Sequence, residues 1–166
     1  MRPRLVARIA LTLACSASGL VHLLAHQSAA ALTGPSAVKS YERDKAVLLK
    51  TAELMPAEHF GFRQAANDKP FSAQLIAVAA LGVSACGELL GKPGDLGTPD
   101  PQATIVTKPA VINALSKGFA TCDAYFGTLT DGKVPADNVR HILDHMNSMA
   151  TYLAASLRAK GIDPPR

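Results

Sequence analysis

The sequence lacks tryptophan altogether and is poor in aromatic and charged residues, which make up 5% and 18% of its 166 positions. It contains only three cysteines, while 48% of its residues are apolar. This balance excludes a disordered tail, a collagen and a polytopic membrane protein. It predicts one compact domain rather than two or three.

Recognisable catalytic motifs are also missing. The chain has no H-E-x-x-H, P-loop or G-x-S-x-G pattern. Ser72, Ser84 and Ser148 have no partners at a spacing typical of a catalytic triad. We therefore expect no catalytic residue and a protein that is not an enzyme, with a metal-dependent enzyme kept as the alternative below.

Positive charge is concentrated at the N-terminus. The chain has 17 basic and 13 acidic residues, and Arg2, Arg4 and Arg8 all lie in the first ten positions. Without that segment the net charge falls from +4 to +1. Binding to nucleic acid needs a dense basic face that neutralises phosphates. We therefore expect no nucleic-acid partner.

The basic start is followed by an apolar stretch over residues 9–25 and by small residues at 28–31. This order is typical of a secretory signal peptide. Polar residues interrupt the stretch, which is shorter than the roughly 20 apolar residues that a membrane-spanning helix needs. We expect residues 1–31 to be a signal peptide cleaved within 28–32, and residues 32–166 to be a periplasmic or secreted domain without a membrane span. A lipoprotein anchored through Cys15 is the alternative.

Export changes the meaning of the other two cysteines, Cys86 and Cys122. Disulfides persist outside the cytoplasm, where a lone buried thiol is a liability. Both residues also fall on the apolar faces of predicted helices, and free cysteines are often small core residues. A disulfide and two separate core thiols are therefore both open interpretations.

Apolar residues recur every three to four positions in four segments, at about 36–54, 70–90, 108–130 and 135–160. This period is the signature of amphipathic helices, and no segment has the alternation of a strand. Residues 91–101 are rich in Gly and Pro and predict a long crossing loop between the second and third helices. Four helices with one apolar side each can all bury that side by packing around a common axis, so the predicted fold is an all-α four-helix bundle. The short links before the second and fourth helices favour antiparallel neighbours.

Three histidines follow the predicted signal peptide: His59, His141 and His145. His141 and His145 are one helical turn apart, a spacing that can hold zinc or nickel when a facing helix adds a third ligand. At 100° per residue, however, His145 falls at the border of the apolar stripe and His141 points outward. Two surface histidines are therefore the simpler interpretation. We expect His59 to lie in a loop packed across the end of the bundle.

Four short segments occur in a familiar order along the expected mature chain. They are LMPAEHFGFR at 54–63, KPFSAQL at 69–75, FATCDA at 119–124 and LRAKGIDPP at 157–165. In these segments the chain resembles the DinB-like four-helix bundle proteins, in particular their exported branch. The resemblance implies that residues 32–166 form a DinB-like domain, and that a homodimer is possible because family members often pair. Members typically hold a divalent metal with three histidines, used in some branches for thiol transfer or hydrolysis.

Carried over residue by residue, the family's ligand positions correspond to Ala77, His145 and Met149. Alanine cannot bind a metal, and a thioether is a poor ligand for zinc or nickel. The resemblance therefore implies an exported bundle that has lost its metal site, holds no cofactor and serves as a non-catalytic binding or structural module. The alternative is a metal-dependent enzyme of the thiol transferase or hydrolase type, with zinc or nickel in a rearranged site around His145, joined by His141 and His59.

Overall fold

The computed structural model describes residues 32–129, 134 and 136–165. The elements in these ranges are α1 (Gly34–Leu54), η1 (Ala57–His59), α2 (Phe71–Leu81), η2 (Gly82–Cys86), α3 (Gly87–Leu89), α4 (Pro101–Thr104), α5 (Lys108–Phe126) and α6 (Ala136–Ala159). No strand occurs among the described residues, so the predicted all-α class is confirmed. The predicted signal peptide, with Cys15, lies outside the described residues.

Local sequence signals explain where the long helices begin and end. Thr33 and Ser36 form a reciprocal capping box at the start of α1, and Pro56 stands just after its end. Pro109 occupies the first turn of α5, where a missing N–H costs nothing. The stretch α2, η2 and α3 forms one continuous helix of 19 residues. The four predicted helical segments therefore each correspond to one long helix.

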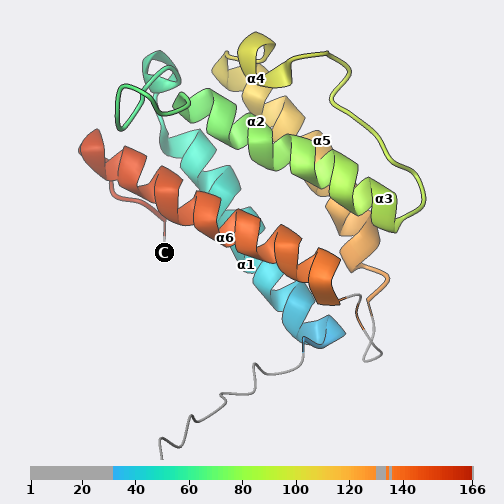
Figure 1. Cartoon of the computed structure of the whole chain (residues 1–166). Coiled ribbons are helices and arrows are strands. Elements are labelled where there is room, and N and C mark those ends of the chain that lie inside the picture. The colour runs from blue at the N-terminus through green and yellow to red at the C-terminus, as the bar shows by residue number, and fades with distance from the viewer. Residues whose placement is uncertain (1–31, 130–133, 135, 166) are drawn as a thin grey trace, which may run out of the picture. The chain divides into compact units, whose positions relative to one another are not determined.

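The packing partners of these helices differ from the sequence-based expectation. Figure 1 shows α1 and α6 side by side, running in the same direction. The main partners of α1 are α5 and α6, and the same two helices are the main partners of α2. Consecutive long helices are thus not the neighbours that we predicted. The segment between α1 and α2, residues 55–70, is long enough to lead α2 away to the diagonal position.

α2 and α5 run parallel and approach each other very closely. A Cβ added at Gly118 would lie 2.6 Å from the carbonyl oxygen of Ala79, and one added at Gly82 would lie 2.9 Å from that of Gly118. One turn further along both helices, Cys86 and Cys122 form a disulfide with their Cα atoms 5.1 Å apart. Of the two interpretations of the cysteines, the structure therefore has the disulfide.

The parallel arrangement of α2 and α5 determines the path of the Gly- and Pro-rich connection. From the end of α3 the chain returns along the length of α2, as Figure 1 shows, and α4 packs against α2. The side-chain ammonium of Lys69, just before α2, donates to Gln102 of α4 at 2.6 Å. The predicted long connection after the second helix is therefore present, but it runs along α2 and contains the helical turn α4, which the sequence did not predict.

A short π-helical segment, η2, interrupts the regular helix that begins with α2. On α2 the apolar residues Phe71, Leu75 and Val78 are buried. Cys86, the last residue of η2, is buried too, as its predicted place on an apolar face implies, while Ala85 beside it is half-buried.

The core is a single cluster of side chains from all four long helices. Tyr41 of α1 stacks on Phe126 of α5, with ring centroids 4.2 Å apart. Its hydroxyl donates to Asp123 Oδ1 at 2.6 Å, and Lys45 Nζ donates to the same oxygen at 2.6 Å. Burial and the hydrogen bond to Asp123 raise the pKa of Tyr41 far above its ordinary value, so the phenol is neutral. Asp123 thus ties α5 to α1.

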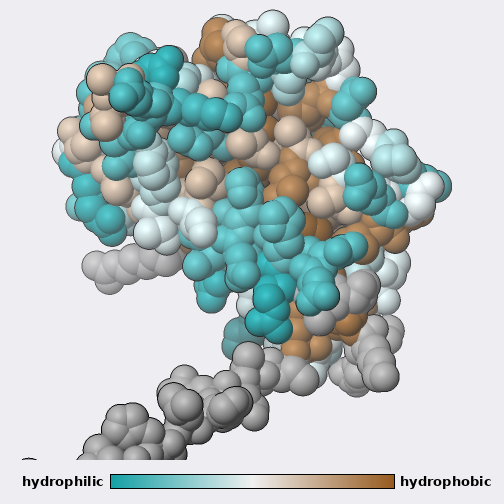
Figure 2. All heavy atoms as spheres, in the orientation of Figure 1, coloured by the Kyte–Doolittle hydropathy of each residue, from teal (hydrophilic) through white to brown (hydrophobic). Residues whose placement is uncertain are grey.

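Polar residues cover the side of α6 that faces the viewer in Figure 2, while apolar residues gather over the neighbouring part of the face.

The helix Phe71–Leu89 is long and apolar enough to cross a membrane by length and composition alone. It packs against both α5 and α6, so much of its apolar surface is already used inside the domain.

Candidate functional site

The three positions that the resemblance to DinB-like proteins assigns to metal ligands lie on α2 and α6, two helices that pack against each other. Ala77 on α2 and Met149 and His145 on α6 are all half-buried. Met149 packs against the hydrophobic core. The only metal-binding group that the resemblance suggests at these positions is therefore the imidazole of His145.

The histidines do not come together as a ligand set. His145 Nε2 is buried and has no hydrogen-bond partner among the described residues, while His141 is exposed. His59 is half-buried in η1, which follows the end of α1, whereas His141 and His145 lie in the first half of α6, and α1 and α6 run in the same direction (Figure 1). No three His, Cys, Asp or Glu residues in the described ranges are close enough to hold a metal ion.

Burial of His145 affects its protonation. Burial lowers the pKa of His145 below its ordinary value, and the positive charge that His141 can carry lowers it further. The neutral imidazole is therefore favoured in the folded protein. Neutral imidazole is the form that binds metals, so His145 keeps one lone-pair donor without providing a complete site.

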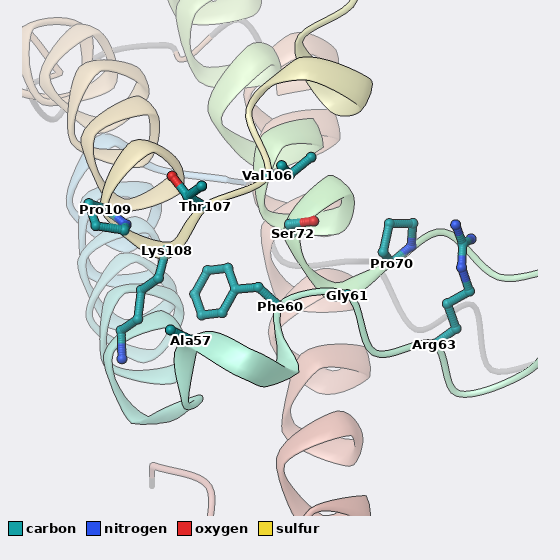
Figure 3. A pocket seen from close by; sticks show the side chains of 10 residues that line it. All are labelled: Ala57, Phe60, Gly61, Arg63, Pro70, Ser72, Val106, Thr107, Lys108 and Pro109. Atoms are coloured by element: carbon teal, nitrogen blue, oxygen red, sulfur yellow. The ribbon is translucent and has the colours of Figure 1, made fainter.

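A pocket of about 500 Å³ lies at the end of the domain where α5 begins. Figure 3 shows its lining, which comes from three separate parts of the chain: Ala57, Phe60, Gly61 and Arg63; Pro70 and Ser72; Val106, Thr107, Lys108 and Pro109. We call it the bundle-end pocket. Its size is within the range of small-molecule sites, which are mostly apolar with a few polar groups.

The first turn of α2 holds one wall of the bundle-end pocket in place. Its N-cap, Pro70, has no side-chain oxygen, so loop carbonyls satisfy the first amides instead. Phe71 N–H donates to Phe62 O at 2.8 Å, and Ser72 N–H donates to Phe60 O at 2.9 Å. The Phe60 ring packs edge-on against Phe71, 5.4 Å between centroids. The wall formed by Phe60 and Ser72 is thus bonded into α2.

Lys108 fixes the opposite wall. Its ammonium donates to the carbonyl oxygens of Glu53 at 2.6 Å and Met55 at 2.9 Å, at the end of α1. A cation in this position also stabilises the negative end of the helix dipole. The same ammonium lies 6.0 Å from the centre of the Phe60 ring. Lys108 therefore brings the end of α1, the loop and the start of α5 together.

Two further hollows adjoin the bundle-end pocket. One, of about 550 Å³, runs along α5 past Ile112 and Ser116 and shares Ala57, Lys108 and Pro109 with it. The other, of about 470 Å³, reaches α4 and shares Arg63, Pro70 and Val106. The three together form a continuous recessed surface at this end of the domain.

A buried carboxylate occurs elsewhere, between α1 and α6. Asp44 is 3% exposed, and its Oδ1 accepts from Arg43 Nε at 2.8 Å. Its Oδ2 has no partner among the described residues. Asp44 lines a polar hollow of about 360 Å³ together with Arg43, Arg140 and Asp144. Opposite charges are balanced in this hollow, which therefore has no preference for a ligand of one sign.

The sequence analysis missed the bundle-end pocket, although it named some of its residues. Ser72 was considered only as a nucleophile, and residues 57–63 only as a loop packed across the end of the bundle. The available signal was the mixture of aromatic, glycine and basic residues in FGFR at 60–63. Because the walls come from segments about 50 residues apart, spacing alone does not bring them together.

Compared with known proteins, the chain matches no protein-family model, and no curated protein has a significantly similar sequence. The resemblance to DinB-like proteins therefore rests on the four quoted segments.

Proposed function

We propose that this protein is an exported, DinB-like four-helix bundle protein that has lost the family's metal site and serves as a non-catalytic binding module. The helical order and the positions of the four long helices support the fold part of the proposal. The Cys86–Cys122 disulfide supports export, because disulfides form and persist in oxidising compartments.

The observation that carries the binding role is the bundle-end pocket. It is lined by residues that offer apolar surface and hydrogen bonds. No histidine or carboxylate lines it to act as a general base beside Ser72 or Thr107, and the Lys108 ammonium is bonded to two backbone carbonyls. We therefore favour a pocket that holds a molecule over one that changes it.

A metal-dependent enzyme of the thiol transferase or hydrolase type is the second candidate, because His145 Nε2 is buried without a partner. A bound zinc or nickel ion would give that nitrogen a partner. Zinc sites that catalyse reactions use three protein ligands, and His145 is the only histidine that matches the family pattern. Ala77 and Met149 have no suitable donor atom, which is why we prefer the binding module.

Metal content separates the two candidates. The full chain is expressed without a histidine tag, recovered as the cell processes it, incubated with zinc or nickel, desalted and analysed by inductively coupled plasma mass spectrometry. We expect far less than one metal ion per chain, and no difference between the natural protein and His145→Ala. His59→Ala tests whether that loop histidine joins the site. Stoichiometric metal that disappears in His145→Ala would favour the enzyme candidate instead.

A further inference from the structure

The bundle-end pocket has a charge of one sign. Arg63 and Lys108 stand on opposite sides of it in Figure 3, with Phe60, Gly61 and Ser72 between them. No aspartate or glutamate lines it. A pocket with cations on both sides and an apolar floor favours a ligand that combines an apolar body with a negative charge.

Ser72 adds a polar group that the fold itself does not use. The residue is 2% exposed, and its backbone N–H is already bonded to Phe60 O. Its hydroxyl makes no hydrogen bond within the described part of the chain, and the residue lines the pocket. The hydroxyl oxygen is not among the fully buried polar atoms that lack a partner, so it reaches the surface of the pocket. Its unused donor and acceptor are therefore available to a polar atom of a ligand there.

The start of α5 offers donors at the same place. Its N-cap residue, Thr107, makes no side-chain capping bond, and Pro109 has no N–H. The backbone N–H groups of Lys108 and Ala110 have no acceptor among the described residues. Free N–H groups at a helix N-terminus, together with the helix dipole, favour an anion.

From these features we infer that the bundle-end pocket binds a small carboxylic acid with an apolar body. The carboxylate accepts from the Ser72 hydroxyl and from the first amides of α5. The nearby charges of Arg63 and Lys108, whose own hydrogen bonds go to backbone carbonyls, favour its negative charge. The apolar body lies against Phe60, Pro70 and Val106. This inference rests on the proposed function, since it names the class of molecule that the binding module takes.

The test uses the full chain, recovered as the cell processes it, and three probe acids: hexanoate, cyclohexylacetate and 3-phenylpropanoate. Each is compared with its primary amide and with the amine of the same skeleton. Binding is followed by NMR through the backbone amides of Phe60, Ser72 and Ala110. We expect at least one acid to bind tenfold or more tightly than its amide and to shift these three amides.

A charge variant tests the electrostatic part of the inference. Val106 is 47% exposed and lines the pocket, so it can be replaced without disturbing the core. Val106→Glu should weaken acid binding by more than tenfold and strengthen binding of the matching amine. Val106→Gln, which has the same shape without the charge, should bind the acid nearly as well as the natural protein.

A second pair of variants tests the hydroxyl. Ser72→Ala should weaken acid binding by roughly tenfold, the usual effect of losing a hydrogen bond to a charged group. Ser116→Ala is the matched control, because the Ser116 hydroxyl already donates to Ile112 O at 2.9 Å and faces an adjoining hollow. We expect no change in that control.

Two results would each overturn the inference. In the first, no probe acid binds with a Kd below about 10 mM. In the second, the acids bind no better than their amides, and Val106→Glu does not change their affinity. The proposed function fails in a different way, through stoichiometric metal that depends on His145. A protein that binds the acids and also holds that metal would refute only the non-catalytic role, so the two failures are distinguishable.

Discussion

Two glycines set how closely α2 and α5 approach. Added Cβ atoms at Gly82 and Gly118 would meet backbone atoms of the opposite helix, which cannot move away as a flexible side chain can. Nothing in the sequence pairs Gly82 with Gly118, because an apolar stripe does not identify its partner helix. Small residues at such crossings allow the backbones to touch.

The first prediction concerns Gly118→Ala. Its Cβ would lie 2.6 Å from Ala79 O and 2.9 Å from Ala79 Cα, so the two helices must separate. Overpacking of this kind costs about 1–3 kcal/mol of unfolding free energy, which urea denaturation measures. Gly61→Ala is the control, because its added Cβ has nothing within 4 Å and its φ is not positive. Equal urea midpoints for the two variants would show that the helix contact is not tight.

The second prediction concerns pH. The folded protein holds the pKa of His145 below the ordinary value near 6.5, so the unfolded chain binds a proton there more readily. The contribution of His145 to stability is therefore fully present above about pH 6.5 and is lost as the pH falls toward its folded pKa. Urea midpoints should fall less between about pH 7 and pH 5 for His145→Gln than for the natural protein.

The matched control for this pH series is His141→Gln. His141 is exposed and contributes to the low pKa of His145 only through its positive charge. Its replacement should reduce the pH dependence less than His145→Gln does. Parallel pH curves for the natural protein and His145→Gln would mean that His145 is not protonated on unfolding in this range.

At the scale of elements, the periodicity of the sequence predicted the existence, type and approximate bounds of the four long helices. It did not predict that α1 and α2 lie diagonally, since a one-sided apolar stripe is satisfied by either neighbour. The π turn in η2 was not predicted either, because a regular 3.6-residue period was assumed through Cys86. Pairing and register depend on contacts between segments, and a single sequence read locally does not contain them.

The third prediction concerns the bond between α2 and α5. Replacing both cysteines, in Cys86→Ala/Cys122→Ala, removes a link that closes 35 intervening residues. The chain-entropy model gives a loss of about 4 kcal/mol in unfolding free energy, again measured by urea denaturation. The control is the natural protein reduced in urea and compared with the same variant. A double variant as stable as the natural protein would contradict the prediction.

At the scale of the whole molecule, the compartment is an expectation from the sequence, and the disulfide is the structural feature that agrees with it. The candidate site was less predictable than the fold. The bundle-end pocket needs residues 57–63, 70–72 and 106–109 together, and these meet only because the α3–α5 connection returns along α2. A site made by topology leaves no motif in the sequence.

The fourth prediction tests export directly. Expression of the full chain in a bacterium should give a periplasmic protein whose intact mass corresponds to loss of an N-terminal segment ending within 28–32. A variant lacking residues 2–25 should stay in the cytosol with Cys86 and Cys122 reduced, as thiol labelling in denaturant reports. A lipid-modified mass at Cys15 would support the lipoprotein alternative, and an uncleaved periplasmic chain would contradict the signal peptide.

The disulfide also bears on the fate of the chain once it has been cut. Residues 91–97 are nearly all exposed and lie between Cys86 and Cys122, which makes them an accessible target for a protease. A cut there breaks the backbone into two pieces, one carrying α1 and α2 and the other α5 and α6. The bond between Cys86 and Cys122 keeps the pieces joined, so the nicked domain migrates as one species until a reductant separates it. Cleavage of this loop therefore leaves the two pieces joined for as long as the surroundings stay oxidising.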